Sequence, residues 1–186
     1  IVDCKGKYIY PSFIDLYSEY GSTPATNSGF RGFNQTQQFE SKTKGAYNWN
    51  QAIKPETNAF LSFQKNESAA KDLRSIGFGT VLTHTHDGIA RGTAALVTLG
   101  NKNENFELIK EKVGVFYSFS KGSSTQDYPG SLMGTIALIR QTYLDAQWYK
   151  TNPPTEGTNI SLQAWNENIA LPQFFDIGAD SERIWC

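Results

Sequence analysis

Apolar and polar residues fall into blocks along this chain, and the blocks predict strands that alternate with helices. Residues 63–76 carry apolar side chains at spacings of three and four, which is the helical period. Gly77 follows this segment and suits the left-handed position that often ends a helix. The order strand, helix, strand predicts a βαβ unit and therefore a parallel sheet. Four short apolar runs have the length of buried strands: 13–16, 78–83, 93–99 and 113–119.

Two later segments also have helical spacing. Residues 131–150 form the longer one, and Ser131 is placed as its N-terminal cap. At about 1.5 Å per residue this helix spans about 30 Å, the length of an outer helix of a barrel. Residues 161–175 form a second amphipathic segment. The side chains of the longer helix that we expect to face the core are Leu132, Ile136, Ile139, Tyr143 and Ala146, widened by Met133, Ala137 and Leu144.

The first residues have the pattern of a β-hairpin. Apolar residues flank a short turn at Lys5–Gly6–Lys7, and Pro11, which has no N–H to donate, ends the pairing. Residues 21–45 are rich in Gly, Ser, Thr, Asn and Gln without a period, which predicts a long loop.

Composition narrows the classes of protein. The chain has 186 residues with 39% hydrophobic residues, enough for one globular domain with a sizeable core. The net charge is −1 and no basic cluster stands out, which argues against nucleic acid or an anionic membrane surface as a partner. No apolar run reaches the roughly 20 residues that a membrane helix needs. The two cysteines, Cys4 and Cys186, are too few for a disulfide framework.

Three blocks of sequence carry a resemblance to a known family. The first block, residues 2–15, reads VDCKGKYIYPSFID. The second, residues 70–99, consists of the end of a helix followed by GFGTVLTHTHDGIARGTAALV at 77–97. The third, residues 133–149, reads MGTIALIRQTYLDAQWY. In this order they resemble the entry strand, the glycine-flanked second strand and the M-G-x-x-A-x-x-R helix of the amidohydrolase superfamily. The sequence of these blocks is most similar to imidazolonepropionase-related members and to large secreted amidohydrolase-like proteins of Bacteroidetes-type bacteria.

The resemblance implies a fold and a division into domains. It places residues 1–11 in a small β-sandwich domain and residues 12–186 in the first part of a (β/α)8 TIM barrel, an α/β fold. A full barrel takes roughly 250 residues. We therefore expect the remainder of a longer amidohydrolase chain, or a second subunit, as partner. The resemblance also implies a bacterial protein in the periplasm or secreted from the cell.

The first barrel strand of the family ends in Ile-Asp-x-His-x-His, whose two histidines bind the catalytic metal, zinc or another divalent transition metal. Tyr17 and Glu19 stand at these two positions here. A carboxylate at Glu19 can serve as a ligand, whereas Tyr17 is a poor replacement for histidine. The other interpretation of Glu19 is a solvated loop residue.

The only two histidines of the chain follow the second predicted strand, as His84-Thr85-His86-Asp87. Side chains at positions i and i+2 of a strand share a face, so both imidazoles can point into a pocket at the carboxyl end of the sheet. His84, His86, Asp87 and Glu19 are therefore the candidate metal ligands of a displaced site. The alternative is that both histidines bind loop backbone.

Arg91, between two glycines, is a candidate for binding a substrate carboxylate, and Tyr17 is the second candidate substrate contact. A structural salt bridge is the alternative role of Arg91. The chain has no G-x-S-x-G elbow, P-loop or dinucleotide fingerprint.

Three functions follow, and whether this segment is an enzyme stays open. By resemblance, the chain contributes to hydrolysis of a C–N bond, in a cyclic amide or another non-peptide amide, once the rest of a barrel completes it. The alternative is a catalytically degenerate barrel module that serves structure or binds a ligand or partner, which Tyr17 and Glu19 favour. A carbohydrate-binding module, based on Trp49, Trp148 and Trp165, ranks last because aromatic residues at helical spacing usually belong to a core.

Overall fold

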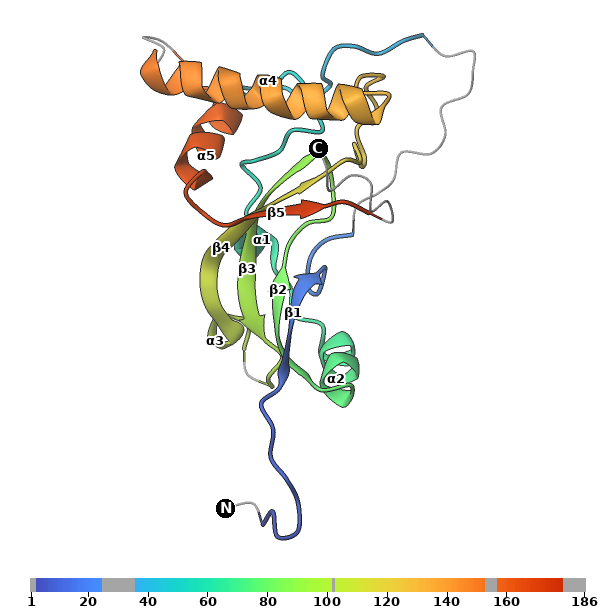
Figure 1. The fold of residues 1–186 in the computed structure, drawn as a ribbon, viewed down its shortest axis with the longest axis vertical. Helices are drawn as coiled ribbons and strands as arrows, with labels where there is room; N and C mark the ends of the chain where they lie inside the picture. The colour runs from blue at the N-terminus through green and yellow to red at the C-terminus, as the bar shows by residue number, and fades with distance from the viewer. Residues whose placement is uncertain (1–2, 25–35, 102, 153–156, 179–186) are drawn as a thin grey trace.

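The computed structural model describes residues 3–24, 36–101, 103–152 and 157–178. Five strands form one curled sheet in the order β1-β2-β3-β4-β5, with the longest helix lying across one end of it (Figure 1). The strands are β1 (Phe13–Ser18), β2 (Phe78–Thr83), β3 (Ala90–Thr98), β4 (Leu108–Ser118) and β5 (Gln173–Asp176). The helices are α1 (Ala59–Ser62), α2 (Glu67–Ser75), α3 (Glu104–Glu107), α4 (Leu132–Thr151) and α5 (Ile160–Asn168).

The sheet is mixed, which corrects the prediction of a parallel sheet. β1 and β2 pair in parallel and enclose α2, so the predicted βαβ unit is confirmed. β3 then pairs antiparallel with both β2 and β4, while β4 and β5 pair in parallel. Only six residues separate β2 from β3, too few for the crossover that a parallel neighbour requires.

The helix before β2 is shorter than predicted but ends as expected. Its N-terminal cap is Asn66, whose side chain accepts a hydrogen bond from the Ala69 backbone N–H at 3.1 Å. Gly77 has φ of 99°, the left-handed conformation that follows the helix. Ala70 is fully buried against the sheet, in a cluster with Tyr20, Val81 and Val97.

The predicted buried stripe of α4 is mostly wrong. The Ser131 cap is confirmed, since its side chain accepts from the Gly134 N–H. The buried residues of the helix are Thr135, Leu138, Thr142 and Ala146, of which only Ala146 was predicted. Ile139 is partly buried against the core, as predicted, while Met133 is 82% exposed. Apolar residues occur on several faces of this helix, so spacing alone could not select the face that packs.

The predicted amphipathic segment 161–175 divides into two elements. α5 ends at Asn168, and β5 begins at Gln173 after a short turn. Trp165 of α5 packs with Leu138 and Ala146 of α4 and with Tyr117 of β4, which joins both helices to the sheet.

The expected N-terminal hairpin is absent from residues 3–12, which contain no strand. The Lys7 N–H donates to Cys4 O at 2.9 Å, so the predicted turn is present. Tyr8, Ile9 and Tyr10 are between 79% and 87% exposed. An isolated two-stranded hairpin is marginal in water unless an apolar layer supports it, and these side chains are mostly exposed to water. Cys186 lies outside the described residues.

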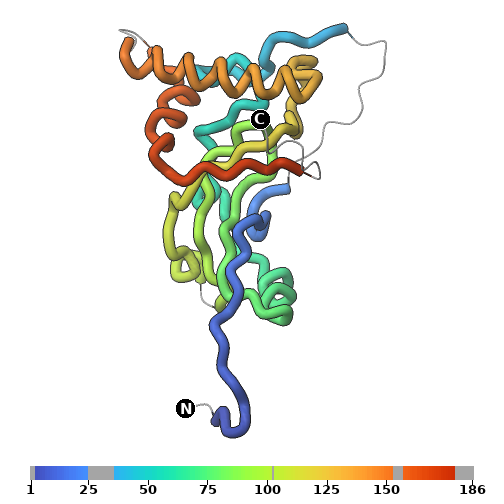
Figure 2. The backbone as a smooth tube through the Cα atoms, in the orientation of Figure 1, coloured from blue at the N-terminus to red at the C-terminus, as the bar shows by residue number. Residues whose placement is uncertain are grey.

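The tubes of Figure 2 show residues 3–12 extending away from the sheet. None of the described helices is long and apolar enough to cross a membrane.

Candidate functional site

Six polar side chains meet where β1, β2 and β5 end and β3 begins. Because β3 runs against its neighbours, its first residues lie at the same end of the sheet as the carboxyl ends of the others. We call this group of residues the mouth: Tyr17, Glu19, His84, His86, Arg91 and Asp176.

One half of the mouth is a closed hydrogen-bonded cluster. The Tyr17 hydroxyl donates to Asp176 Oδ2 at 2.6 Å, and Arg91 Nη1 donates to the same hydroxyl at 3.1 Å. Arg91 Nη1 also lies 3.2 Å from Asp176 Oδ2, while its Nε donates to Gly88 O. Both candidate substrate contacts, Arg91 and Tyr17, are therefore held by protein partners.

The charges in this cluster stabilise one another. Burial tends to raise the pKa of Asp176, but hydrogen bonds from Tyr17 and the Gly178 N–H, together with the Arg91 charge, hold it below its usual value. The pKa of Tyr17 is raised, mainly by burial and then by its hydrogen bond to Asp176. Near neutral pH the cluster is therefore a neutral phenol between a carboxylate and a guanidinium.

The other half of the mouth is a stack of aromatic rings. His84 lies 3.6 Å from the Phe116 ring, centroid to centroid, with the planes 13° apart. Phe116 stacks in turn on Phe174 at 4.8 Å, and the His86 ring lies 4.2 Å from that of His84. The Tyr17 ring is 5.1 Å from His84 and 4.5 Å from His86. The two histidines are thus brought together as predicted.

The imidazole nitrogens have few partners. Both ring nitrogens of His84 and the Nε2 of His86 are buried and have no hydrogen-bond partner among the described residues. His84 is fully buried, and burial lowers its pKa to about 2. Burial, followed by the Arg91 charge, also lowers the pKa of His86. Both imidazoles are therefore neutral at neutral pH. Unpartnered buried nitrogens are uncommon in folded proteins.

Glu19 lies at the edge of the mouth. Its Oε2 is 3.7 Å from His86 Nδ1, and its side chain is 68% exposed. This is a loose contact between a solvated carboxylate and a neutral ring, which contributes little to stability.

Asp87 is turned away from the two histidines. It forms an ion pair with Lys54, and it accepts hydrogen bonds at 2.7 Å from both the backbone N–H and the hydroxyl of Ser123. Burial tends to raise its pKa, but these partners outweigh burial and lower it. Asp87 therefore joins three loop segments.

The donors of the mouth do not match a catalytic metal site. Such sites use three protein ligands, and the described residues contain no group of three or more His, Cys, Asp or Glu side chains that could hold a metal ion. His84 and His86 supply two imidazoles, and Glu19 is the one nearby carboxylate in loose contact with them. Tyr17 occupies the space beside both rings.

Sequence reasoning missed Asp176, Phe116 and Phe174. The run Phe174-Phe175-Asp176 has two aromatic residues before a carboxylate, a strand end by composition. Leu162, Trp165 and Ile169 precede this run at helical spacing, so the predicted amphipathic segment 161–175 extends over Phe174 and Phe175 and ends just before Asp176.

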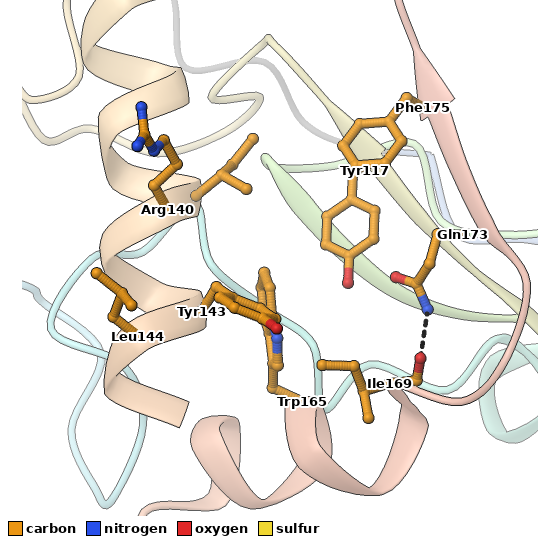
Figure 3. Close-up of a pocket in the computed structure, with 9 residues that line it drawn as sticks. Tyr117, Arg140, Tyr143, Leu144, Trp165, Ile169, Gln173 and Phe175 are labelled. Carbon is orange, nitrogen blue, oxygen red and sulfur yellow. Dashed lines mark hydrogen bonds between the residues drawn. The ribbon is translucent and has the colours of Figure 1, made fainter. Parts of the chain in front are cut away.

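A groove of about 500 Å³ lies on the other side of β5, between that strand and α4 and α5 (Figure 3). Aromatic and aliphatic side chains form most of its walls, and Arg140 and Gln173 are its polar residues. Its lining consists of Tyr117, Ile139, Arg140, Tyr143, Leu144, Trp165, Ile169, Gln173 and Phe175.

Comparison with solved structures finds an amidohydrolase from Thermotoga maritima with a TM-score of 0.64 and 16% sequence identity. The match covers 95% of this chain and 47% of that chain, so this chain spans about half the length of its structural match. No protein-family model and no curated protein matches the sequence. The likeness shows the fold: a mixed α/β chain whose curled five-stranded sheet corresponds to part of an amidohydrolase structure.

Proposed function

We propose that this chain is half of an amidohydrolase-like barrel whose mouth has a structural or ligand-binding role instead of metal-dependent hydrolysis. The observation that carries the proposal is the position of Tyr17. Its hydroxyl bonds to Asp176 and Arg91, and its ring lies against both histidines. A phenol with a raised pKa keeps its proton, so it does not offer the anionic oxygen that a metal would need.

The second position supports the same function. Glu19, which stands where the family has its second first-strand histidine, is mostly exposed and only loosely contacts His86. A single carboxylate on a solvated loop does not fix a metal without further ligands. In this proposal, the mouth holds a hydrogen-bonded cluster of Tyr17, Arg91 and Asp176 where the family has its metal ligands.

Elemental analysis of the purified protein tests the proposal. After loading with excess zinc and desalting, we expect far less than one zinc ion per chain. The positive control is the double variant Tyr17→His, Glu19→His, which places imidazoles beside His84 and His86 and should retain more zinc. Stoichiometric zinc in the natural sequence would overturn the proposal.

One observation favours a second candidate function, C–N bond hydrolysis by a displaced metal site once further residues complete the barrel. The neutral imidazoles of His84 and His86 have unpartnered nitrogens, and neutral imidazole is the form that binds metal. This candidate predicts that His84→Ala with His86→Ala lowers the amount of bound zinc. An unchanged zinc content in that variant would remove it.

A further inference from the structure

The groove between β5 and the helices α4 and α5 faces away from the mouth. Phe116 and Phe174 belong to the aromatic stack of the mouth. Side chains alternate along a strand, so their neighbours Tyr117 and Phe175 point to the opposite face, where they line the groove. The volume of the groove, about 500 Å³, lies within the range of about 300–1,000 Å³ that is typical of small-molecule sites. The groove is therefore a candidate binding site separate from the mouth.

One polar group inside the groove lacks a partner. Tyr117 is only 5% exposed, and its hydroxyl points into the groove (Figure 3). Burial alone raises the pKa of this phenol, and no hydrogen bond from the described residues contributes. Buried hydroxyl groups are ordinarily hydrogen-bonded. The Tyr117 hydroxyl is thus placed to donate to an acceptor atom of a bound molecule.

Aromatic rings form most of the walls. Tyr117 stacks on Phe175 with ring centroids 5.0 Å apart, and it packs on Trp165 at 5.3 Å. Tyr143 lines the groove from α4. Tyr143 and Phe175 are 41% and 53% exposed, so much of the aromatic surface is open to a ligand. Contacts between rings add to the gain from apolar burial, and the walls therefore favour a planar aromatic ligand.

The charge of the groove is positive. Arg140 is the one charged residue among the described residues that line it. Its side chain is exposed and has no ion pair or hydrogen bond within the described part of the chain. The amide nitrogen of Gln173, by contrast, already donates to Leu171 O at 2.7 Å. A guanidinium binds a carboxylate through two parallel hydrogen bonds, so the groove is complementary to an anion.

We propose that this groove binds a small planar aromatic carboxylate that carries a second polar atom on its ring. The ring packs against the aromatic walls, and the carboxylate pairs with Arg140. The second polar atom accepts a hydrogen bond from Tyr117. The site shares no residue with the mouth, so the proposal does not depend on the proposed function.

Calorimetric titration with 6-hydroxy-2-naphthoate tests the proposal, with two related compounds as comparisons. We expect saturable binding with a Kd of about 1 mM or tighter, as for other ligands of this size. 2-Naphthol, which lacks the carboxylate, should bind about tenfold more weakly. Equal affinity for the two compounds would overturn the proposal. So would the absence of binding, which is the result expected if another polypeptide segment covers the groove.

A matched pair of charge variants tests the role of Arg140. Arg140→Gln should abolish the preference for the carboxylate, because it removes the guanidinium and leaves the walls intact. Lys150→Gln loses the same charge at an exposed position of the same helix, outside the groove. That control should keep the tenfold preference. If both variants lose it to the same extent, the general charge of the protein attracts the ligand and the site is wrong.

Tyr117→Phe tests the buried hydroxyl. It should weaken binding of 6-hydroxy-2-naphthoate about fivefold and leave 2-naphthoate, which has no ring hydroxyl, unaffected. The unfolding free energy should not fall, because the removed hydroxyl has no partner among the described residues. Equal affinities of the variant and the natural sequence for 6-hydroxy-2-naphthoate, or equal weakening for both ligands, would contradict the assigned hydrogen bond.

Nuclear magnetic resonance of the tryptophan indole N–H groups locates the bound ligand. The Trp165 signal should shift during the titration, while those of Trp49 and Trp148, which do not line the groove, should stay in place. An unmoved Trp165 signal would place the ligand elsewhere and overturn the proposal. None of these results bears on zinc content, so the proposed function is judged separately.

Discussion

Two neighbouring strands of the same sheet differ sharply in their surroundings. Leu82 in β2 is 1% exposed, and Leu16 in β1 is 57% exposed. β2 lies between two paired strands, whereas among the described residues β1 has a neighbour on one side only. Both sequences are apolar runs of strand length, so the difference arises from position in the sheet and not from composition.

The same contrast holds at the carboxyl ends of the two strands. After β2, the His84 ring is fully buried in an aromatic stack and Asp87 is fixed by Lys54 and Ser123. After β1, Glu19 is largely in water. The strands in the middle of the sheet are thus paired on both sides and buried, while β1 is an edge strand whose apolar side chains are exposed. The following predictions test that difference.

The largest effect is expected from truncating the two leucines. Leu82→Ala should lower the free energy of unfolding by about 3 kcal/mol, since it removes buried methyl groups and leaves a cavity. Leu16→Ala, measured in dilute protein, should cost well under about 1 kcal/mol. Urea unfolding measures both. Equal losses would contradict the difference between the strands.

The two acidic residues near the mouth form a second matched pair. Asp87→Ala should cost about 2–3 kcal/mol, because it leaves the Lys54 ammonium and the Ser123 N–H without their carboxylate. Glu19→Ala should change stability by less than about 0.5 kcal/mol. Urea unfolding of both variants measures the two losses in unfolding free energy. A large loss at Glu19 would show that the β1 end is as firmly fixed as the β2 end.

The buried histidine gives stability a dependence on pH. The folded-state pKa of His84 is about 2, against an ordinary value of 6.5, so between these values the unfolded chain takes up a proton that the folded chain does not. Stability should fall as the pH drops below 6.5, by up to about 1.4 kcal/mol per pH unit. Between pH 7 and 5 the carboxylates Asp87 and Asp176, whose pKa values are lowered, remain charged. Their contribution is lost at lower pH.

The control for this dependence is His84→Leu, which should reduce the change in unfolding free energy between pH 7 and 5 and leave the part that His86 contributes, because its pKa is also lowered. If the unfolding free energy of that variant depended on pH as steeply as in the natural sequence, groups other than His84 would take up the protons on unfolding.

The smallest effect is expected at the phenol of the mouth. Tyr17→Phe removes the hydrogen bonds to Asp176 and Arg91 but keeps the ring against the histidines. The loss should be about 1 kcal/mol, because Arg91 and Asp176 still pair directly. Tyr17→Ala, which also removes the ring, should cost more. If Tyr17→Phe were as harmful as Tyr17→Ala, the hydroxyl would carry the whole role of this side chain.

Local sequence signals predicted the parts of the fold that local contacts determine. The strand 78–83, the Gly77 conformation and the Ser131 cap depend on neighbouring residues, and all three are confirmed. The direction of β3 and the buried face of α4 depend on distant partners. The prediction of a parallel β3 was wrong, and the predicted face of α4 was right only at Ala146 and in part at Ile139.

In the candidate site too, contacts between sequence neighbours were predictable and contacts between distant residues were not. The pairing of His84 with His86 follows from strand alternation and is confirmed as proximity. The contact of Tyr17 with Asp176 joins residues 159 positions apart, so no local pattern could reveal it. The metal assignment itself stays a prediction.

Amide hydrogen exchange of β1 compared with β3 and β4 tests the account most directly. The account predicts strong protection of β3 and β4, each of which lies between two paired strands. It predicts faster exchange of β1, whose outer edge has no partner strand among the described residues. Protection of β1 equal to that of β3 would contradict the claim that this edge is open in the single chain.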